Sequence, residues 1–454
     1  MELLELKSQD IIKVVRSQKQ PKDYQEFLRQ YNPEKHEIHD KTKRMPKTIK
    51  VDGGEKVVDV SRLSIPFQEI IVDRASVFMI GEGVELKSQP DTEAQELLYK
   101  MLKRTWYDNK LDYLTRQMAR IWMSETEVAE LWYFHEKNAK DTWAGLDITP
   151  GGEKKMRVQI LANSLGDKLY PYFDDYGDMI AFGRQYIVDT KEYFDLYTSD
   201  YILYFENKRG WKEIDRKENK LKKIPIIYYN REKPEWSNVQ HLIERYETMI
   251  SNFADSNDYF ASPMVKVKGK VEGFAQKGEQ GKVLQLEENA DANYLTWDQA
   301  PEAIRLEKDT LQELIFSMTQ TPDISFKQMQ GLGNISGISL KLMFLDAKLK
   351  ALKHQEIFGQ GIQRRINLLK HGMGLVSISV DGAKSLQVEP QFTFYLPENV
   401  QETINTLMTA TGNKAIMSRK TAIKQNPLIV DAEQELDDII EDDAGQFGNF
   451  MDES

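Results

Sequence analysis

Apolar positions along the chain change period several times, and each change predicts a different kind of element. Between Thr92 and Met123 apolar side chains recur every three or four residues, which predicts helix with a break near Asn109. From Val128 to Phe205 apolar and polar positions alternate, and turn sequences such as DDYG and NKRG separate the runs. This pattern predicts a layer of antiparallel strands, closed by a proline-marked edge strand at 222–230.

Two further helical patterns flank a small β segment. Residues 237–262 carry an apolar stripe, and Ser237 with Gln240 matches a capping box at the start. Residues 301–321 carry a second stripe. The residues between them, 263–300, alternate as short strands. Because each stripe needs an apolar partner, we expect the two helices to pack against each other as a hairpin or against copies in neighbouring subunits.

The longest helical pattern, 336–372, follows the glycine-rich segment 322–335. Its apolar positions step by four and three residues until the phase changes near Gly359 and Gly361. A glycine inside a helix costs roughly 1 kcal/mol relative to alanine. We therefore expect the helix to bend at these two positions.

The last part of the chain returns to strand and then to helix. Residues 386–399 read as a strand, and we expect it to pair with the β layer of residues 128–230. Helical patterns follow, one of them with Ser418 as its cap. Together these elements predict an α+β fold.

Composition and charge narrow the classes of protein. The chain has no cysteine, which excludes disulfides and thiolate metal sites. No window approaches the length of apolar sequence that spans a membrane, and the amino terminus lacks the pattern of a signal peptide, so we expect neither. The formal net charge is −11. Any contact with nucleic acid should therefore be local or weak, because affinity for phosphates comes from clustered Lys and Arg.

No nucleotide or catalytic motif is recognisable. A P-loop signature is absent, and the glycines of GLGNISG (331–337) are spaced as G-x-G-x-x-x-G without a preceding strand. Ser336 lies where a helix cap belongs and not in a nucleophile motif. We expect no cofactor, no catalytic residues and no enzymatic activity.

Two clusters contain residue types that can bind a metal. His36 and His39 in KHEIHD can share a metal with a neighbouring carboxylate, but a solvated polar loop is the preferred interpretation. A run of acidic residues near the carboxyl end can bind cations, but a solvated helix end is preferred; the run is Asp437, Asp438, Glu441, Asp442 and Asp443. We expect no metal.

Several lysines allow two interpretations. Lys341 and Lys348 lie on one face of the long helix, either as a solvated face or as a sparse basic ring when subunits repeat about an axis. Lys350 stands four residues after Asp346, which predicts an ion pair. The same two interpretations apply to three lysines that alternate on one strand face, Lys266, Lys268 and Lys270.

The order of these elements resembles that of the portal proteins of tailed double-stranded DNA phages, the head-to-tail connectors of siphovirus type. IIVDRASVFMIGEGVEL is similar to an early helix of that family, and FTFYLPENVQETINTL to its returning strand. The strongest match is TPDISFKQMQGLGNISGISLKLMF, where five residues precede the amphipathic helix as they do there: Pro322, Asp323, Asn334, Ser336 and Gly337. The resemblance begins near residue 64, and ARIWMSETEVAELWYF lacks a glycine that the family often has there.

The resemblance implies a portal fold with a β-rich and helical wing, a two-helix stem, a small α/β clip, a long kinked helix and a helical crown. The implied parts are a wing at 1–236 with 373–400 returning to it, stem helices at 237–262 and 301–321, a clip at 263–300, a tunnel loop at 322–335, the long kinked helix at 336–372, and a crown with an acidic tail at 401–454.

The resemblance also implies a ring of twelve subunits at one capsid vertex, assembled in the host cytoplasm, with DNA passing through its centre and no membrane contact. Implied partners are the packaging motor (the terminase large subunit), the head-tail adaptor, and the major capsid and scaffolding proteins. The clip lysines would contact the motor and adaptor. The DNA-facing loop residues would be Lys327, Gln328, Met329, Gln330, Gly331, Gly333 and Asn334.

Two alternatives remain open at this point. The β-rich domain can belong to a metal-dependent nucleic-acid-processing enzyme, which predicts DNA cleavage with divalent metal. The chain can also be a non-ring structural subunit, such as a monomeric scaffold or adhesin.

Overall fold

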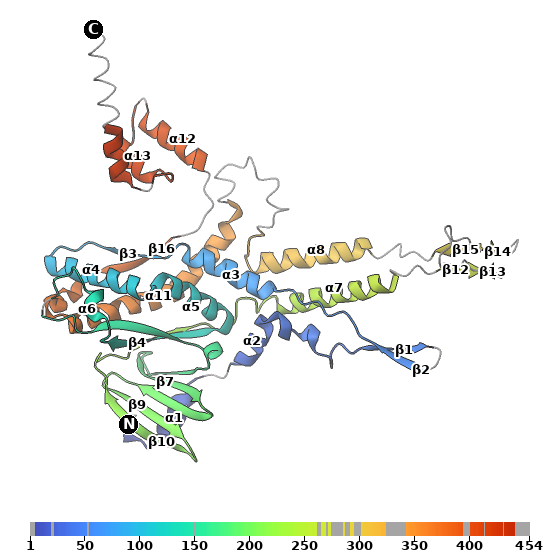
Figure 1. The fold of residues 1–454 in the computed structure, drawn as a ribbon, viewed down its shortest axis with the longest axis horizontal. Helices are drawn as coiled ribbons and strands as arrows, with labels where there is room; N and C mark the ends of the chain where they lie inside the picture. Colours follow the sequence, from blue (N-terminus) through green and yellow to red (C-terminus); the bar gives the residue numbers. More distant parts are fainter. Residues whose placement is uncertain are drawn as a thin grey trace, which may run out of the picture. The chain divides into compact units, whose positions relative to one another are not determined.

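The structure is a computed structural model that describes residues 5–19, 22–51, 54–148, 150–260, 265–268, 271–273, 285–286, 291–294, 301–323, 342–393, 400–412, 414–429 and 431–440. The chain divides into two compact units (Figure 1). The larger comprises Met1–Pro322 and Ala347–Phe394, and the smaller comprises Asp323–Asp346 and Tyr395–Ser454.

The larger unit combines helices and antiparallel sheets, as the sequence predicts. Four helices build most of its core: α3 (Phe67–Ile80), α4 (Glu93–Asp108), α5 (Leu111–Glu125) and α11 (Leu345–Val376). They lie beside a sheet of order β11-β4-β5, made of β4 (Glu127–His135), β5 (Lys155–Leu161) and β11 (Ile226–Asn230). The predicted break between α4 and α5 is confirmed, because the Asn109 side chain caps the carboxyl end of α4 by donating to Thr105 O at 2.9 Å.

A second sheet is an antiparallel meander of order β10-β9-β8-β7-β6. Its strands are β6 (Lys168–Phe173), β7 (Met179–Val188), β8 (Lys191–Tyr197), β9 (Tyr201–Asn207) and β10 (Trp211–Glu218). Helix α1 (Ser8–Ser17) covers one face of this sheet with Ile11, Ile12 and Val15, which pack with buried side chains such as Phe194 and Phe205. The predicted β layer is therefore present, divided between two sheets. Short helical turns complete the unit: α6 (Ala139–Thr142), η4 (Asn163–Leu165) and η5 (Ile378–Ser385).

The late strand does not join this layer, so that prediction is wrong. β16 (Val388–Phe392) pairs antiparallel with β3 (Val84–Ser88), with Val388 opposite Ser88. Pro390 lies within β16 and has no N–H to donate, which restricts such a strand to an edge. A two-stranded ribbon consists only of edges, so it accommodates this strand.

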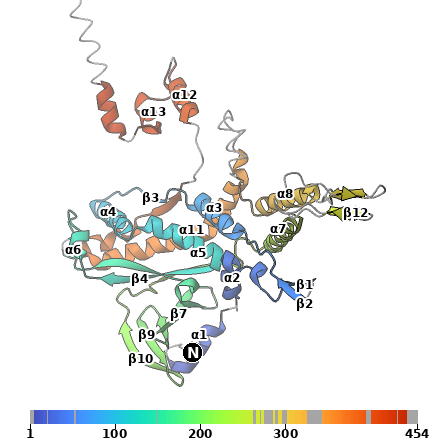
Figure 2. The ribbon, with the colours of Figure 1, turned by 45° about the vertical axis from the view of Figure 1, so that its right-hand side comes forward.

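Helices α7 (Gln240–Phe260) and α8 (Pro301–Met318) lie side by side (Figures 1 and 2), so the two apolar stripes pack as a hairpin. Arg245 Nη2 lies 2.7 Å from Glu307 Oε1 across this contact. The predicted capping box is not formed: α7 begins at Gln240, whose side chain donates to Glu244 Oε1. Two small ribbons lie between the helices in the sequence, β12 (Val265–Lys268) with β15 (Asp291–Tyr294) and β13 (Val271–Gly273) with β14 (Gln285–Leu286).

The amino-terminal region forms an arm that leads to α3. It contains α2 (Tyr24–Tyr31), η2 (Pro33–Lys35), η3 (Glu37–His39) and a ribbon of β1 (Lys47–Val51) with β2 (Gly54–Val58). In the smaller unit, α12 (Val400–Thr411) precedes α13 (Arg419–Gln425), and Ser418 caps α13 by accepting from Thr421 N at 3.2 Å, as predicted. Across the described residues, no helix has the length and apolar character needed to span a membrane.

Candidate functional site

A buried polar cluster forms where β11 leads toward α7. Glu235 is its centre: Lys350 Nζ lies 2.6 Å from Glu235 Oε1, while Arg231 Nη1 and His354 Nε2 lie 2.5 and 3.3 Å from Oε2. Burial by itself would raise the pKa of Glu235, but the hydrogen bond from His354 and the charges of Arg231 and Lys350 outweigh it, so the pKa lies well below its ordinary value. The ionised carboxylate therefore ties α11 to the segment before α7.

The same lysine fastens the end of α8. Lys350 Nζ donates to Thr319 O at 2.5 Å, and Arg74 Nη1 donates to Pro322 O at 2.5 Å. These bonds fix the chain just before the predicted tunnel loop. The predicted pair of Lys350 with Asp346 is wrong, because Lys350 lies on the buried face of α11 and needs a buried counter-charge, which Glu235 supplies.

An extended stretch of the arm runs along α7 in matched register. The backbone N–H groups of Ser61, Leu63 and Ile65 donate to side chains spaced four residues apart on the helix, namely Asp255 Oδ1 at 2.7 Å, Ser251 Oγ at 3.0 Å and Glu247 Oε1 at 2.8 Å. Two extended residues span about 6.6 Å. Four helical residues span about 6 Å. The two repeats therefore stay in step. We call this contact the arm clamp.

The arm clamp also contains the histidine weighed as a metal ligand. His36 is only 4% exposed, and its Nδ1 lies 2.6 Å from Glu247 Oε1. His39 Nε2 lies 3.0 Å from Ser64 Oγ instead. The interpretation of a solvated loop is wrong for His36, because its ring is buried against α7. Among the described residues, no group of three or more His, Cys, Asp or Glu is arranged to hold a metal.

A second buried ion pair holds the middle of α11. Arg365 Nη2 lies 2.5 Å from Glu130 Oε1 on β4, and both side chains are fully buried. Tyr229 and Trp132 donate to the same carboxylate at 2.6 and 2.7 Å. Burial would lower the pKa of Arg365, but the Glu130 charge outweighs it and the pKa is raised. Removing either partner would leave a buried uncompensated charge, so the pair fixes how α11 sits on the sheet.

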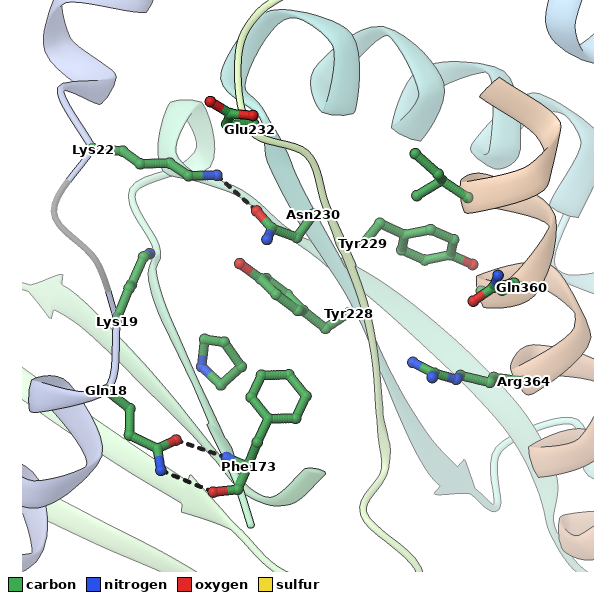
Figure 3. A pocket seen from close by; sticks show the side chains of 13 residues that line it. Gln18, Lys19, Lys22, Phe173, Tyr228, Tyr229, Asn230, Glu232, Gln360 and Arg364 are labelled. Atoms are coloured by element: carbon green, nitrogen blue, oxygen red, sulfur yellow. Dashed lines mark hydrogen bonds between the residues drawn. The ribbon is translucent and has the colours of Figure 1, made fainter. Parts of the chain in front are cut away.

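A cavity of about 500 Å³ lies between the segment after α1, β11 and α11 (Figure 3). Gln18 bonds both the N–H and the carbonyl of Phe173, as an added strand residue would, and Lys22 donates to Asn230 Oδ1 at 2.7 Å. Lys19 donates to buried Glu127 at 2.8 Å. Lys19 and Lys22 are thus engaged in joining the amino-terminal segment to the sheets, which accounts for these two cations structurally.

The first turns of α11 carry a row of exposed leucines. Four leucines at helical spacing, Leu342 just before the helix and three within it, are 42–65% exposed, whereas the side that includes Lys350 and His354 is buried. We call these four residues the leucine stripe: Leu342, Leu345, Leu349 and Leu352. A row of exposed leucines beside a buried lysine and histidine differs from the pattern expected for a helix on the surface of a monomer.

The predicted site residues fall into three groups. The loop residues 327–331, 333 and 334, together with Lys341 and Lys270, lie outside the described residues. Lys348 is half-buried on α11, Lys266 lies on β12, and Lys268 is exposed at the end of β12. Gly359 and Gly361 both lie inside α11, which continues past the predicted end at Gly372 to Val376.

Sequence reasoning missed the arm clamp and the Glu235 cluster. For the arm clamp a signal existed, because Glu247, Ser251 and Asp255 form a polar row at a spacing of four along the helix. For Glu235 the local pair with Arg231 gave no sign of the cluster, since the other two partners, Lys350 and His354, stand more than a hundred residues later.

Comparison with known proteins places the chain. The model of one protein family, described as phage portal protein, SPP1 Gp6-like, matches residues 13–446. No curated protein matches. Similar solved structures include the neck of an empty GTA particle computed with C6 symmetry, at TM-score 0.43 and 10% identity over 78% of this chain and 87% of that one. The neck of a native GTA particle computed with C12 symmetry gives TM-score 0.41 and 10% identity over 80% and 88%. Because the family match spans nearly the whole chain, the protein belongs to the phage portal protein family of the SPP1 Gp6-like type.

Proposed function

We propose that this portal protein forms a closed ring of twelve copies at one capsid vertex, the channel through which DNA enters during packaging and leaves during ejection. The first support is that the chain belongs to the phage portal protein family. The leucine stripe is the observation that carries the proposal for this chain, because its side chains stay 42–65% exposed in the isolated subunit. Burying one leucine is worth about 1.5–3 kcal/mol. A stripe repeated in every subunit therefore favours contact between copies.

The loop at 322–335 is proposed as the part that meets DNA. Thr319 and Pro322, at its start, are held by Lys350 and Arg74, so the loop would begin from a fixed base. Its glycines permit backbone conformations that other residues resist. A chain of net charge −11, with Lys341 and Lys348 as the candidate channel lysines, suits a channel that moves DNA without binding it tightly.

The roles of the remaining parts are proposed from the resemblance to portal proteins. Residues 263–300 are proposed as the clip that contacts the terminase large subunit and later the head-tail adaptor, with Lys266, Lys268 and Lys270 on its surface. Residues 401–454 are proposed as a crown inside the head, and the capsid and scaffolding proteins as partners during assembly. The subunit itself is proposed to have no enzymatic activity.

Negative-stain images of the purified full chain test this proposal. We expect top views of rings with a central hole and rotational symmetry, and a particle mass of about twelve chains by native mass spectrometry. A single-chain species, both alone and when co-expressed with the scaffolding protein of the same phage, would contradict it. Cleavage of DNA by the purified chain with Mg²⁺ or Mn²⁺ would instead favour a nucleic-acid-processing enzyme.

A further inference from the structure

The ribbon of β1 and β2 is attached at its base and exposed beyond it. All five residues of β2 are exposed, with Val57 at 66% and Val58 at 38%, and Met45 before β1 is 68% exposed. A two-stranded ribbon alone in water is at best marginally stable, and its edges offer unpaired backbone groups. The exposed apolar side chains therefore call for a covering surface.

The base of the ribbon is tied firmly to α7. Arg44 Nη2 lies 3.0 Å from Asp255 Oδ2, and Arg44 also donates to Asn252 Oδ1 at 2.9 Å and to Ser61 O at 2.8 Å. Together with the arm clamp, these bonds hold both chain ends of the ribbon against one helix. The ribbon is thus presented in a defined direction.

The ribbon region and the two helices carry opposite charge. Residues 41–62 contain seven basic and three acidic side chains, in a chain whose overall charge is negative. Helices α7 and α8 together contain eight acidic and three basic side chains. Complementary charges of this kind favour a specific pairing of the two surfaces.

One face of α8 has the composition that the ribbon needs. Glu302, Leu306, Asp309 and Glu313 recur at helical spacing, and all four are exposed, Leu306 at 70%. Asp309 is partly neutralised by Lys308 at 3.1 Å and Arg305 at 3.9 Å on its own helix. On this face Leu306 is therefore flanked along the helix by acidic side chains. We call these four residues the acidic stripe.

The ribbon does not reach the acidic stripe of its own chain. The arm clamp uses the side of α7 that carries Glu247, whereas Arg245, which contacts α8, lies nearly opposite because two residues turn a helix by about 200°. Figures 1 and 2 agree that the ribbon and α8 flank α7 on opposite sides. In a closed ring built by rotation, one flank of each subunit faces the other flank of the next.

We propose that the β1–β2 ribbon is a clasp that lies on the acidic stripe of α8 in the neighbouring copy of this chain. The proposal rests on the ring put forward above. The strand register places Thr48, Lys50 and Val57 on one face of the ribbon. On this face Lys50 meets the stripe's carboxylates and Val57 covers Leu306. The clasp gives the amino-terminal arm a role in closing the ring.

The absence of cysteine permits a clean test. Two full-length chains with tags of different size, one Thr48→Cys and the other Thr310→Cys, are mixed before assembly and treated with a short bismaleimide. We expect a covalent heterodimer from assembled rings. A matched pair of Thr48→Cys with Tyr176→Cys, at an exposed turn, should give none.

Charge-reversal variants test whether the ribbon and the acidic stripe are held together by opposite charges. E302K/E313K in the Thr310→Cys chain should lower the cross-link yield several-fold. K50E in the Thr48→Cys chain should restore part of it, whereas K56E, on the opposite face of the ribbon, should not. Rings in the micrographs without the heterodimer would overturn the clasp and leave the ring intact. Absence of rings would overturn the ring itself. Loss of duplex DNA binding in K50E rings that never cross-link would assign the ribbon to DNA and also overturn the clasp.

Discussion

Gly361 illustrates how one residue can have two explanations. From sequence it is half of a pair that predicts a bend in the long helix. In the structure α11 continues through it, and a Cβ atom at this position would lie 2.1 Å from Cε1 of Tyr229. At Gly359 the nearest atom, Cε2 of Phe392, would lie 3.4 Å away. Close approach to the sheet thus explains Gly361, while the bend itself stays a prediction.

The two glycines should therefore respond oppositely to alanine. Gly361→Ala should lower the free energy of unfolding by about 1–3 kcal/mol, because an added methyl overpacks the contact with Tyr229. Gly359→Ala should raise it by up to about 1 kcal/mol through helix propensity. Urea denaturation of both variants measures this. Equal effects of one sign would contradict the assignment.

Asp195 is a buried carboxyl outside the candidate site. It is 3% exposed and accepts hydrogen bonds from Tyr197 at 3.2 Å and Tyr186 at 3.3 Å. Burial is the largest influence and raises its pKa to about 6, against the opposing charge of Arg184. Between pH 3.8 and about 6 the folded chain keeps a proton that the unfolded chain loses, so this group makes stability fall as pH rises.

Asp195→Asn removes that penalty. At pH 7.5 the free energy of unfolding of the variant should exceed that of the parent by up to about 3 kcal/mol, for a pKa shift of this size. Near pH 4 the difference should disappear. Parallel denaturation curves at the two pH values measure it, with exposed Asp175→Asn as the control for loss of a surface charge. The assignment would be refuted if the stability of the variant, relative to that of the parent, were lower at pH 7.5 than at pH 4.

At the scale of elements, the sequence predicts what depends on neighbours in the chain. The break at Asn109, the cap at Ser418 and the strands after Val128 each follow from a local pattern and are present. Pairing of β16 with β3 joins residues some three hundred positions apart, and no local pattern encodes that choice. The Glu235 cluster is hidden for the same reason, since charged residues on a helix resemble a solvated face until their partners are known.

The loop after α8 offers a prediction at this scale. Deleting Gln328 to Gly333 should leave ring assembly unchanged, because α8 and α11 remain joined through Lys350. DNA packaging should stop, because the proposed DNA-facing groups are gone. Ring images and a nuclease-protection assay of packaged DNA measure the two outcomes. Normal packaging would show that the loop assignment is wrong.

For the whole molecule, the leucine stripe is the feature on which the proposed ring depends. Leu349→Asp with Leu352→Asp should prevent rings by placing carboxylates in an apolar contact between copies. Both residues are exposed in the subunit, so its circular dichroism and melting temperature should change little. Leu165→Asp, equally exposed on a turn, is the matched control and should still form rings. Intact rings from the double variant would remove the stripe from the interface.

The arm clamp also restricts which lengths of the arm can bind α7. Its N–H donors come from every second residue of the arm, and its acceptors from every fourth residue of α7. Inserting one residue between Ser61 and Ile65 would turn the following donors away from the helix, whereas inserting two would keep their direction and move them by one acceptor. Only insertions of an even number of residues therefore keep the N–H donors directed at α7. Each added pair of residues moves the arm by about one turn of the helix.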